Sequence, residues 1–141
     1  MGKILNAILV IILIVSLVGC GKVDYSKMTV EEILEKSGKI KSFSEVDGHY
    51  SITLQTELVS DKAKYELTME TGKILDRLKD RDIKTINLTW EIELIDQDGN
   101  KEYKPVMRIT FEDKTWIDAE HHTDLPRLAN DYWEHEVLNQ D

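Results

Sequence analysis

Cysteine is nearly absent from this chain, since it occurs once, at position 20, and proline occurs only twice. A lone cysteine has no partner for an intramolecular disulfide, so the folded part of the chain depends on its hydrophobic core for stability. The motifs of several enzyme classes are also missing: the sequence contains no G-x-S-x-G, no H-E-x-x-H and no glycine-rich phosphate loop. We therefore expect a protein that is not an enzyme.

Positive charge is scarce as well. The chain has 18 lysines and arginines against 27 aspartates and glutamates. Residues 1–19 contain one lysine and no acid, so the remainder has 17 basic and 27 acidic side chains and a formal charge of −10. Phosphate backbones and anionic headgroups repel such a domain. This charge argues against a nucleic acid partner and against attachment to a membrane by charge alone.

Long hydrophobic runs are limited to the first twenty residues. Residues 4–18 are apolar apart from Asn6 and Ser16, and Lys3 precedes them. A helix needs about twenty apolar residues to span a bilayer, so this shorter run suits the hydrophobic region of a secretory signal peptide. The alternatives are an uncleaved membrane anchor and N-myristoylation at Gly2. N-myristoylation is excluded because Asn6 occupies the position at which the myristoylation motif has serine or threonine.

The apolar run ends in Leu17-Val18-Gly19-Cys20, which resembles the lipobox of bacterial lipoproteins. The resemblance implies a signal peptide over residues 1–19, cut before Cys20, and a diacylglycerol or other acyl modification on the Cys20 thiol. Residues 20–28 would then be the lipidated cysteine and a short tether. The seven residues 21–27 reach about 25 Å at most when extended, so the domain would lie close to the extracytoplasmic face of the bacterial cell membrane.

Residues 29–141 are predicted to form a single α+β domain, built from a small antiparallel sheet of three to four strands with helices packed mainly on one face. Thr29-Val30-Glu31-Glu32 predicts a capping box and a short helix that ends at Gly38. Residues 39–48 are interpreted as a connector. The alternation over 49–58 predicts a half-buried strand.

Residues 61–80 fit a strand and a helix, and their composition favours the helix, with residues 73–79 helical in both interpretations. The next two alternating segments predict a hairpin with Asp98-Gly99 as a two-residue turn. This register predicts five apolar pairs: Leu94–Tyr103, Ile92–Pro105, Trp90–Met107, Leu88–Ile109 and Ile86–Phe111. It also places Glu93 opposite Lys104 and Asp96 opposite Lys101. Residues 124–138 are predicted as a final short helix, capped by Asp124 and with Pro126 in its first turn.

The densest group of potential metal ligands is Glu120-His121-His122-Thr123-Asp124, and His135 follows on the next segment. Imidazole and carboxylate together suit zinc or copper, so Glu120, His121, His122, Asp124 and His135 form a candidate metal site. The spacing matches no known motif. The alternative is therefore a solvated polar loop between the sheet and the last helix.

Trp116 and Trp133 are candidate contacts for a protein partner, because an exposed aromatic pair near the end of the sheet makes a binding patch. Trp90 faces the predicted core instead. The C-terminal half is also similar to small, uncharacterised lipoproteins and exported domains of Gram-positive bacteria. The segments that carry this similarity are Asp96-Gln97-Asp98-Gly99-Asn100 and Leu125-Pro126 with Ala129-Asn130-Asp131-Tyr132-Trp133-Glu134-His135.

That resemblance implies no activity and transfers no catalytic residue. The sequence therefore favours a membrane-anchored extracytoplasmic lipoprotein that acts as a binding or accessory module, with an envelope protein as its partner. The alternative is a zinc- or copper-binding surface lipoprotein. A hydrolase is a third hypothesis, and it requires a deep pocket that holds a perturbed carboxylate–histidine pair.

Overall fold

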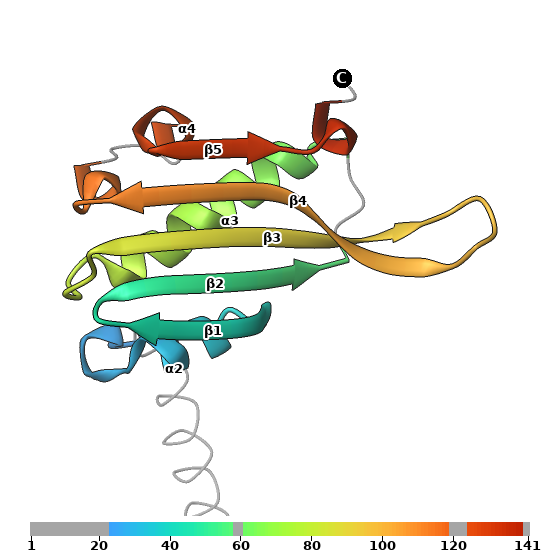
Figure 1. The fold of residues 1–141 in the computed structure, drawn as a ribbon. Helices are drawn as coiled ribbons and strands as arrows, with labels where there is room; N and C mark the ends of the chain where they lie inside the picture. Colours follow the sequence, from blue (N-terminus) through green and yellow to red (C-terminus); the bar gives the residue numbers. More distant parts are fainter. Residues whose placement is uncertain (1–22, 58–60, 119–123, 140–141) are drawn as a thin grey trace, which may run out of the picture.

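The computed structural model describes residues 23–57, 61–118 and 124–139. Five strands form one sheet in the order β1-β2-β3-β4-β5 (Figure 1). The elements in chain order are η1 (Tyr25–Lys27), α2 (Val30–Glu35), β1 (Ile40–Val46), β2 (His49–Thr56), α3 (Ala63–Leu78), β3 (Thr85–Ile95), β4 (Lys101–Glu112), η2 (Thr115–Asp118), α4 (Leu125–Leu128), β5 (Asp131–Glu134) and η4 (Glu136–Asn139).

The predicted α+β class is confirmed, but the predicted antiparallel sheet of three to four strands is wrong in two respects. The sheet has five strands, and β2 pairs with β3 in parallel while the other neighbours are antiparallel. The parallel pair follows from the connection, because α3 carries the chain back along the sheet before β3 begins. None of the described helices is long and apolar enough to span a membrane.

The segment interpreted as a connector is the first strand of the sheet. Asp47 and Gly48 join β1 to β2 and have φ angles of 53° and 83°. Two successive positive φ angles are typical of the type I′ turn, whose twist matches that of the flanking strands. Phe43 and Tyr50 then lie on the covered face with their ring centroids 5.8 Å apart. The Asp-Gly dipeptide is therefore a hairpin signal here too.

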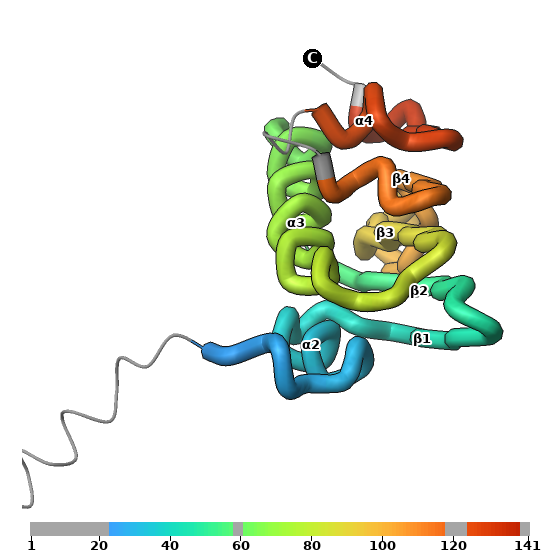
Figure 2. Tube along the Cα trace, turned by 90° about the vertical axis from the view of Figure 1, so that its left-hand side faces the viewer, coloured from blue at the N-terminus to red at the C-terminus, as the bar shows by residue number. Residues whose placement is uncertain are grey.

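The predicted capping box is confirmed: Thr29 Oγ1 accepts from the Glu32 N–H at 3.2 Å, and Glu32 Oε2 accepts from the Thr29 N–H at 2.7 Å. The preference for a helix in residues 61–80 is confirmed as well. Leu67, Ile74 and Leu78 lie on the buried face of α3, which packs across one face of the sheet (Figure 2). The described residues place no helix on the opposite face.

The hairpin register is confirmed in its inner half and wrong near the turn. Trp90 pairs with Met107, and the predicted pairs of Leu88 and Ile86 are also present. Beyond Trp90 the pairing shifts by one residue, because Val106 is the extra residue of a bulge. Gly99, with a φ of 84°, closes a longer turn in which its N–H donates to the Asp96 carbonyl at 3.1 Å. This geometry is that of a type I turn followed by a glycine bulge.

The charged pairs near that turn change accordingly. Glu93 lies opposite Tyr103 rather than Lys104, and Lys101 lies opposite Ile95 rather than Asp96. Lys101 Nζ instead reaches Glu93 Oε2 diagonally at 2.8 Å. The loop shifts the register by one residue and the bulge shifts it back, so the inner pairs keep the predicted alignment.

The predicted C-terminal helix is wrong over most of its length. The helix α4 has four residues, and β5 follows it along the free edge of β4. The chain is extended there because β4 supplies backbone partners: the Asn130 N–H donates to the Thr110 carbonyl at 2.8 Å, and the His135 N–H donates to the Val106 carbonyl at 2.7 Å. Asp124 precedes α4 but makes no side-chain hydrogen bond to its N-terminus.

Candidate functional site

The predicted metal site is only partly covered by the described residues. Glu120, His121 and His122 lie outside them. Asp124 Oδ1 is 3.7 Å from Arg127 Nη2, and His135 Nδ1 accepts from the Val137 N–H at 3.3 Å. Asp124 precedes α4 and His135 follows β5, so that strand separates them (Figure 1). The described ranges contain no group of three potential metal ligands, and the zinc or copper site stays a prediction that calorimetry with either ion tests.

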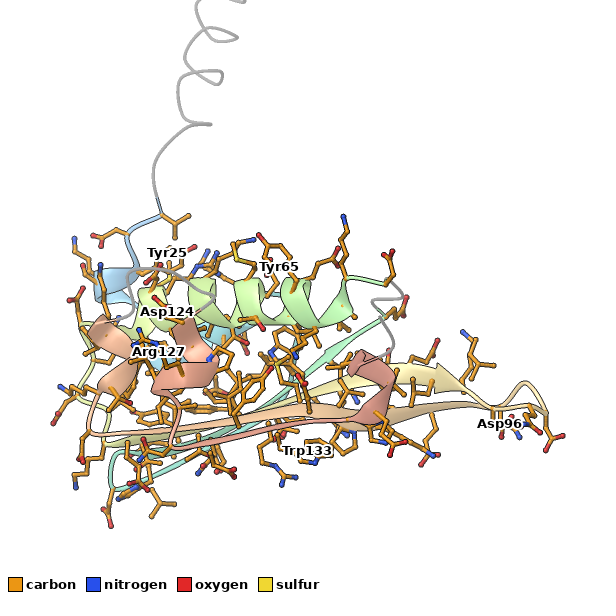
Figure 3. All side chains as sticks on the ribbon, turned by 90° about the horizontal axis from the view of Figure 1, so that it is seen from above. Tyr25, Tyr65, Asp96, Asp124, Arg127 and Trp133 are labelled. Atoms are coloured by element: carbon orange, nitrogen blue, oxygen red, sulfur yellow. The ribbon has the colours of Figure 1, made fainter. Side chains whose placement is uncertain are left out.

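The structure does not bring Trp116 and Trp133 together as an exposed aromatic pair. Trp116 is 3% exposed and packs edge-on against Phe111, with ring centroids 6.0 Å apart. Asp113 and Lys114 have positive φ angles of 53° and 59°, which turn the chain so that η2 folds back against the core. Trp133 is 39% exposed and lies on the other side of the sheet, away from α3 (Figure 3). The two rings therefore belong to different faces.

Trp133 belongs to the face of the sheet that the described helices leave uncovered. Strand register aligns two rows of side chains across all five strands of this face. The first row runs Ser42, Thr53, Thr89, Arg108, Trp133, and the second runs Ser44, Ser51, Asn87, Thr110, Asp131. We call these ten residues the open face. All are polar except Trp133.

Trp133 has polar neighbours on two sides. The Arg108 guanidinium carbon is 5.7 Å from the centroid of the indole ring, and the His135 ring centroid is 6.1 Å away at an interplanar angle of 75°. A cation–π contact at an exposed site contributes about 0.5–1 kcal/mol. Further along the second row, the Thr110 hydroxyl donates to Asn87 Oδ1 at 2.9 Å. These contacts orient the side chains and leave Trp133 partly exposed.

The strand that presents Trp133 is attached to α3 through its covered face. The Tyr132 hydroxyl donates to Glu134 Oε2 at 3.0 Å, and Lys64 Nζ on α3 lies 2.7 Å from Glu134 Oε1. Burial, together with the hydrogen bond to Glu134, raises the pKa of the Tyr132 phenol well above its usual range. The phenol therefore stays protonated and keeps donating to Glu134, and the ion pair of Glu134 with Lys64 attaches β5 to α3.

Next to the first row, Glu91 accepts from Lys41 Nζ and from Gln55 Nε2, each at 2.8 Å. Partial burial raises the pKa of the Glu91 carboxyl, but the hydrogen bonds from Lys41 and Gln55 lower it by more, and the net pKa is below its usual value. Glu91 is thus held in its ionised form. An ionised carboxylate bound by a lysine is suited to a structural role rather than to donating a proton.

Glu91 makes stability depend on pH in a defined direction. Since its pKa is lower in the folded state, its contribution is present above the unfolded-state pKa of about 4.3 and is lost as the pH falls through the folded-state pKa. We expect Glu91→Gln to lower the free energy of unfolding by about 0.2–1 kcal/mol at pH 7. The difference from wild type should shrink as the pH falls through the folded-state pKa.

Urea unfolding at pH 7 and pH 3 measures this effect. The matched control is Glu35→Gln, which removes an exposed carboxylate at the end of α2. A difference between wild type and Glu91→Gln that is the same at both pH values would contradict the assignment.

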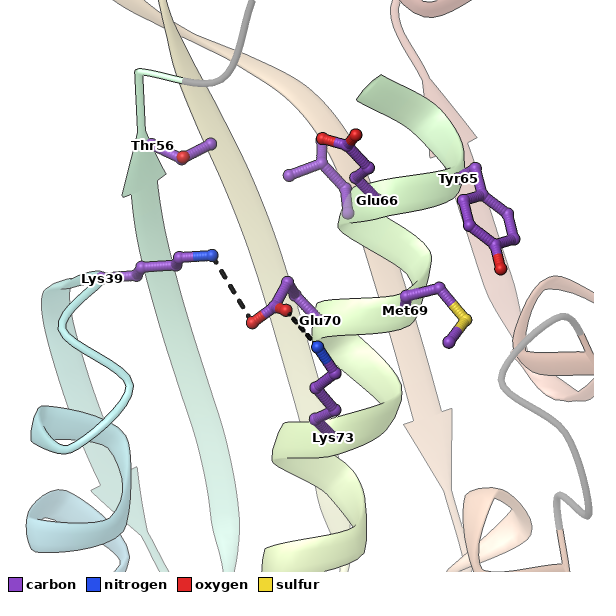
Figure 4. Close-up of a pocket in the computed structure, with 8 residues that line it drawn as sticks. Lys39, Thr56, Tyr65, Glu66, Met69, Glu70 and Lys73 are labelled. Atoms are coloured by element: carbon purple, nitrogen blue, oxygen red, sulfur yellow. Dashed lines mark hydrogen bonds and ion pairs between the residues drawn. The ribbon is translucent and has the colours of Figure 1, made fainter. Parts of the chain in front are cut away.

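The covered side of the molecule carries a second candidate, a groove of about 330 Å³ between α3 and the ends of β1 and β2 (Figure 4). Glu70 accepts from Lys73 Nζ at 2.6 Å and lies 3.4 Å from Lys39 Nζ. The hydrogen bond from Lys73 lowers the pKa of Glu70, outweighing partial burial. Because Glu66 and Glu70 balance the two lysines, the groove has no excess charge with which to select an ion.

Sequence reasoning found Trp133 but missed the surface to which it belongs. The polar alternation of Asn87 and Thr89 in the predicted hairpin was the available signal for one face of the sheet. Arg108 was missed as a neighbour of Trp133, because that contact depends on the pairing of β4 with β5. No known family model, curated protein or solved structure matches the chain, so the site rests on its own geometry.

Proposed function

We propose that the chain is a lipid-anchored extracytoplasmic lipoprotein that acts as a non-enzymatic binding or accessory module at the bacterial membrane surface. The observation that carries the proposal is Leu17-Val18-Gly19-Cys20 directly after an apolar run too short to span a bilayer. Cys20 is the only cysteine of the chain, so its lipidation competes with no disulfide.

The contacts of Tyr25 indicate how an anchor at Cys20 would orient the domain. Arg77 near the end of α3 stacks over the Tyr25 ring, with 5.0 Å between the guanidinium carbon and the ring centroid, and Arg81 donates to the Tyr25 carbonyl. Tyr25 thus lies on the helical side of the sheet (Figure 3). Val23 is three residues from Cys20, a distance of about 10 Å at most. An anchor at Cys20 would bring the α3 side towards the membrane and turn the open face away.

Four of the described carboxyls are unsuited to act as general acids. Hydrogen bonds lower the pKa of Asp24, Glu70, Glu91 and Asp96. General acids need carboxyls whose pKa is raised towards neutrality. These four carboxylates instead belong to ion pairs, a cap and a turn.

Substitution of Cys20 tests the anchor. We expect Cys20→Ala to abolish lipidation, so that the protein is released from the membrane fraction or keeps its uncleaved signal. The measurement is membrane fractionation combined with incorporation of labelled fatty acid. Ser26→Ala, six residues further along, is the matched control and should stay anchored. Unchanged processing and membrane attachment of Cys20→Ala would refute the proposal.

A further inference from the structure

We infer that the open face binds a neutral polysaccharide chain, with Trp133 as the stacking platform and Arg108, Asn87 and the hydroxyl side chains as hydrogen-bonding groups. The inference rests on the proposed function in one respect, because it names the ligand class of the proposed binding module.

The first step is the position of Trp133. Indole is the largest side chain, and the other two tryptophans of the chain are at most 3% exposed, whereas Trp133 is 39% exposed. Binding sites commonly combine an exposed aromatic ring with a few placed polar groups that orient the ligand. The C–H face of a sugar ring packs on an aromatic ring, and its hydroxyls need polar partners around that ring. Arg108 supplies such partners next to Trp133.

The second step is the chemistry of the rest of the face. A hydroxyl donates one hydrogen bond and accepts up to two, so it can pair with a sugar hydroxyl in either direction. Short side chains also keep the surface level, so that an extended ligand can lie across the strands. Five strands at about 4.8 Å spacing give a surface about 19 Å long, enough for several sugar rings. Six members of the open face carry such hydroxyls: Ser42, Ser44, Ser51, Thr53, Thr89 and Thr110.

The third step is charge. Arg108 and Asp131 are the charged members of the open face, and their charges cancel. The part of the chain after residue 19 has a formal charge of −10, which repels anionic polymers. A protein partner of the usual kind needs an apolar centre to its interface, whereas the centre of this face is Thr89 and Asn87. A neutral, hydroxyl-rich polymer fits the face best.

The test uses the processed, lipidated protein in detergent and three neutral probes: tetramers of β-1,4-linked N-acetylglucosamine, β-1,4-linked glucose and α-1,4-linked glucose. We expect at least one tetramer to change the tryptophan fluorescence and to bind in calorimetry. Trp133→Ala should weaken that binding by at least about ten-fold, and Trp133→Tyr should retain most of it. Arg108→Gln should weaken it less than Trp133→Ala.

Tyr65→Ala is the matched control, because Tyr65 is an aromatic residue 56% exposed on α3, on the other side of the molecule (Figure 3). It should leave binding unchanged. The absence of binding to all three tetramers at millimolar concentration would overturn the inference, as would binding that Trp133→Ala leaves intact. Trp133-dependent capture of an envelope protein with no tetramer binding would overturn the ligand class.

Failure of this inference and failure of the anchor are distinguishable. Tetramer binding is measured in solution, where it does not depend on Cys20, and Cys20→Ala protein should bind the tetramer as wild type does. A lipidated protein that binds no tetramer refutes only the ligand class. A protein that binds through Trp133 but is not lipidated refutes only the anchor.

Discussion

Replacing Trp90 with alanine is expected to lower the free energy of unfolding by about 3–5 kcal/mol. Trp90 is 0% exposed and lies on β3 beneath α3, at the centre of the core. Alanine would remove the largest buried side chain and leave a cavity that the surrounding strands refill only in part. Urea unfolding followed by far-ultraviolet circular dichroism measures the change. A loss below about 1 kcal/mol would show that this core is not close-packed around Trp90.

The hydrogen bond of Trp90 accounts for a separable part of this stability. Its Nε1–H donates to Thr71 Oγ1 at 2.8 Å, and the Thr71 hydroxyl donates to the Leu67 carbonyl at 2.8 Å. Thr71→Val keeps the shape of the side chain but leaves the indole N–H buried without an acceptor, which costs about 1–3 kcal/mol. Thr71→Ser keeps the hydroxyl and serves as the matched control.

A double-mutant cycle of Trp90→Phe with Thr71→Val isolates the pair, since phenylalanine has no N–H to satisfy. The valine substitution should cost less in the Trp90→Phe background than in wild type. Equal costs in both backgrounds would contradict the hydrogen bond. The cycle also provides a measurement should Trp90→Ala fail to fold.

The second large effect is expected at Trp116, in contrast to Trp133. Trp116→Ala should lower the free energy of unfolding by about 3–5 kcal/mol, because its ring is buried against Phe111. Trp133→Ala should change it by at most about 1 kcal/mol, since it removes an exposed ring and one cation–π contact. The same urea unfolding experiment compares the two. Similar losses at both positions would contradict their assignment to opposite faces.

Trp116→Phe refines this prediction. Among the described residues, Trp116 Nε1 is buried without a hydrogen-bond partner. A buried, unpaired N–H costs free energy, so phenylalanine, which lacks that group, should cost clearly less than alanine. A Trp116→Phe variant as unstable as Trp116→Ala would contradict this prediction.

Much of the fold could be predicted from the sequence wherever neighbouring residues decide the structure. The capping box at Thr29 and Glu32 is confirmed because both partners lie within one helical turn. The helix at 61–80 is confirmed because its composition favours α-structure and one of its faces is apolar. The inner hairpin pairs of Trp90 and Leu88 are confirmed because a one-residue slip would turn apolar side chains to solvent.

Apart from the hairpin register near the turn, the errors in element assignment fall on the two edge strands. β1 has only two partly buried positions, Ile40 and Phe43, so its alternation is weak, and the Asp47-Gly48 turn was the signal that identifies it. β5 has four residues, and Tyr132 and Trp133 fit helical spacing as well as alternation. Four residues are too few to distinguish the two periods. Only the backbone groups that β4 offers along its edge decide between them.

The same distinction applies to the candidate site, because some of its features could be predicted from the sequence and others could not. The sequence by itself determined the acidic balance of the chain, the lone Cys20 at the end of an apolar run and the polar alternation of Asn87 and Thr89, because these are properties of composition and of short segments. Only the tertiary structure decided that Trp116 is buried and Trp133 exposed, and that Arg108 lies beside Trp133. These relations join residues that are distant in the chain. They arise from strand pairing and core packing, which no local sequence pattern encodes.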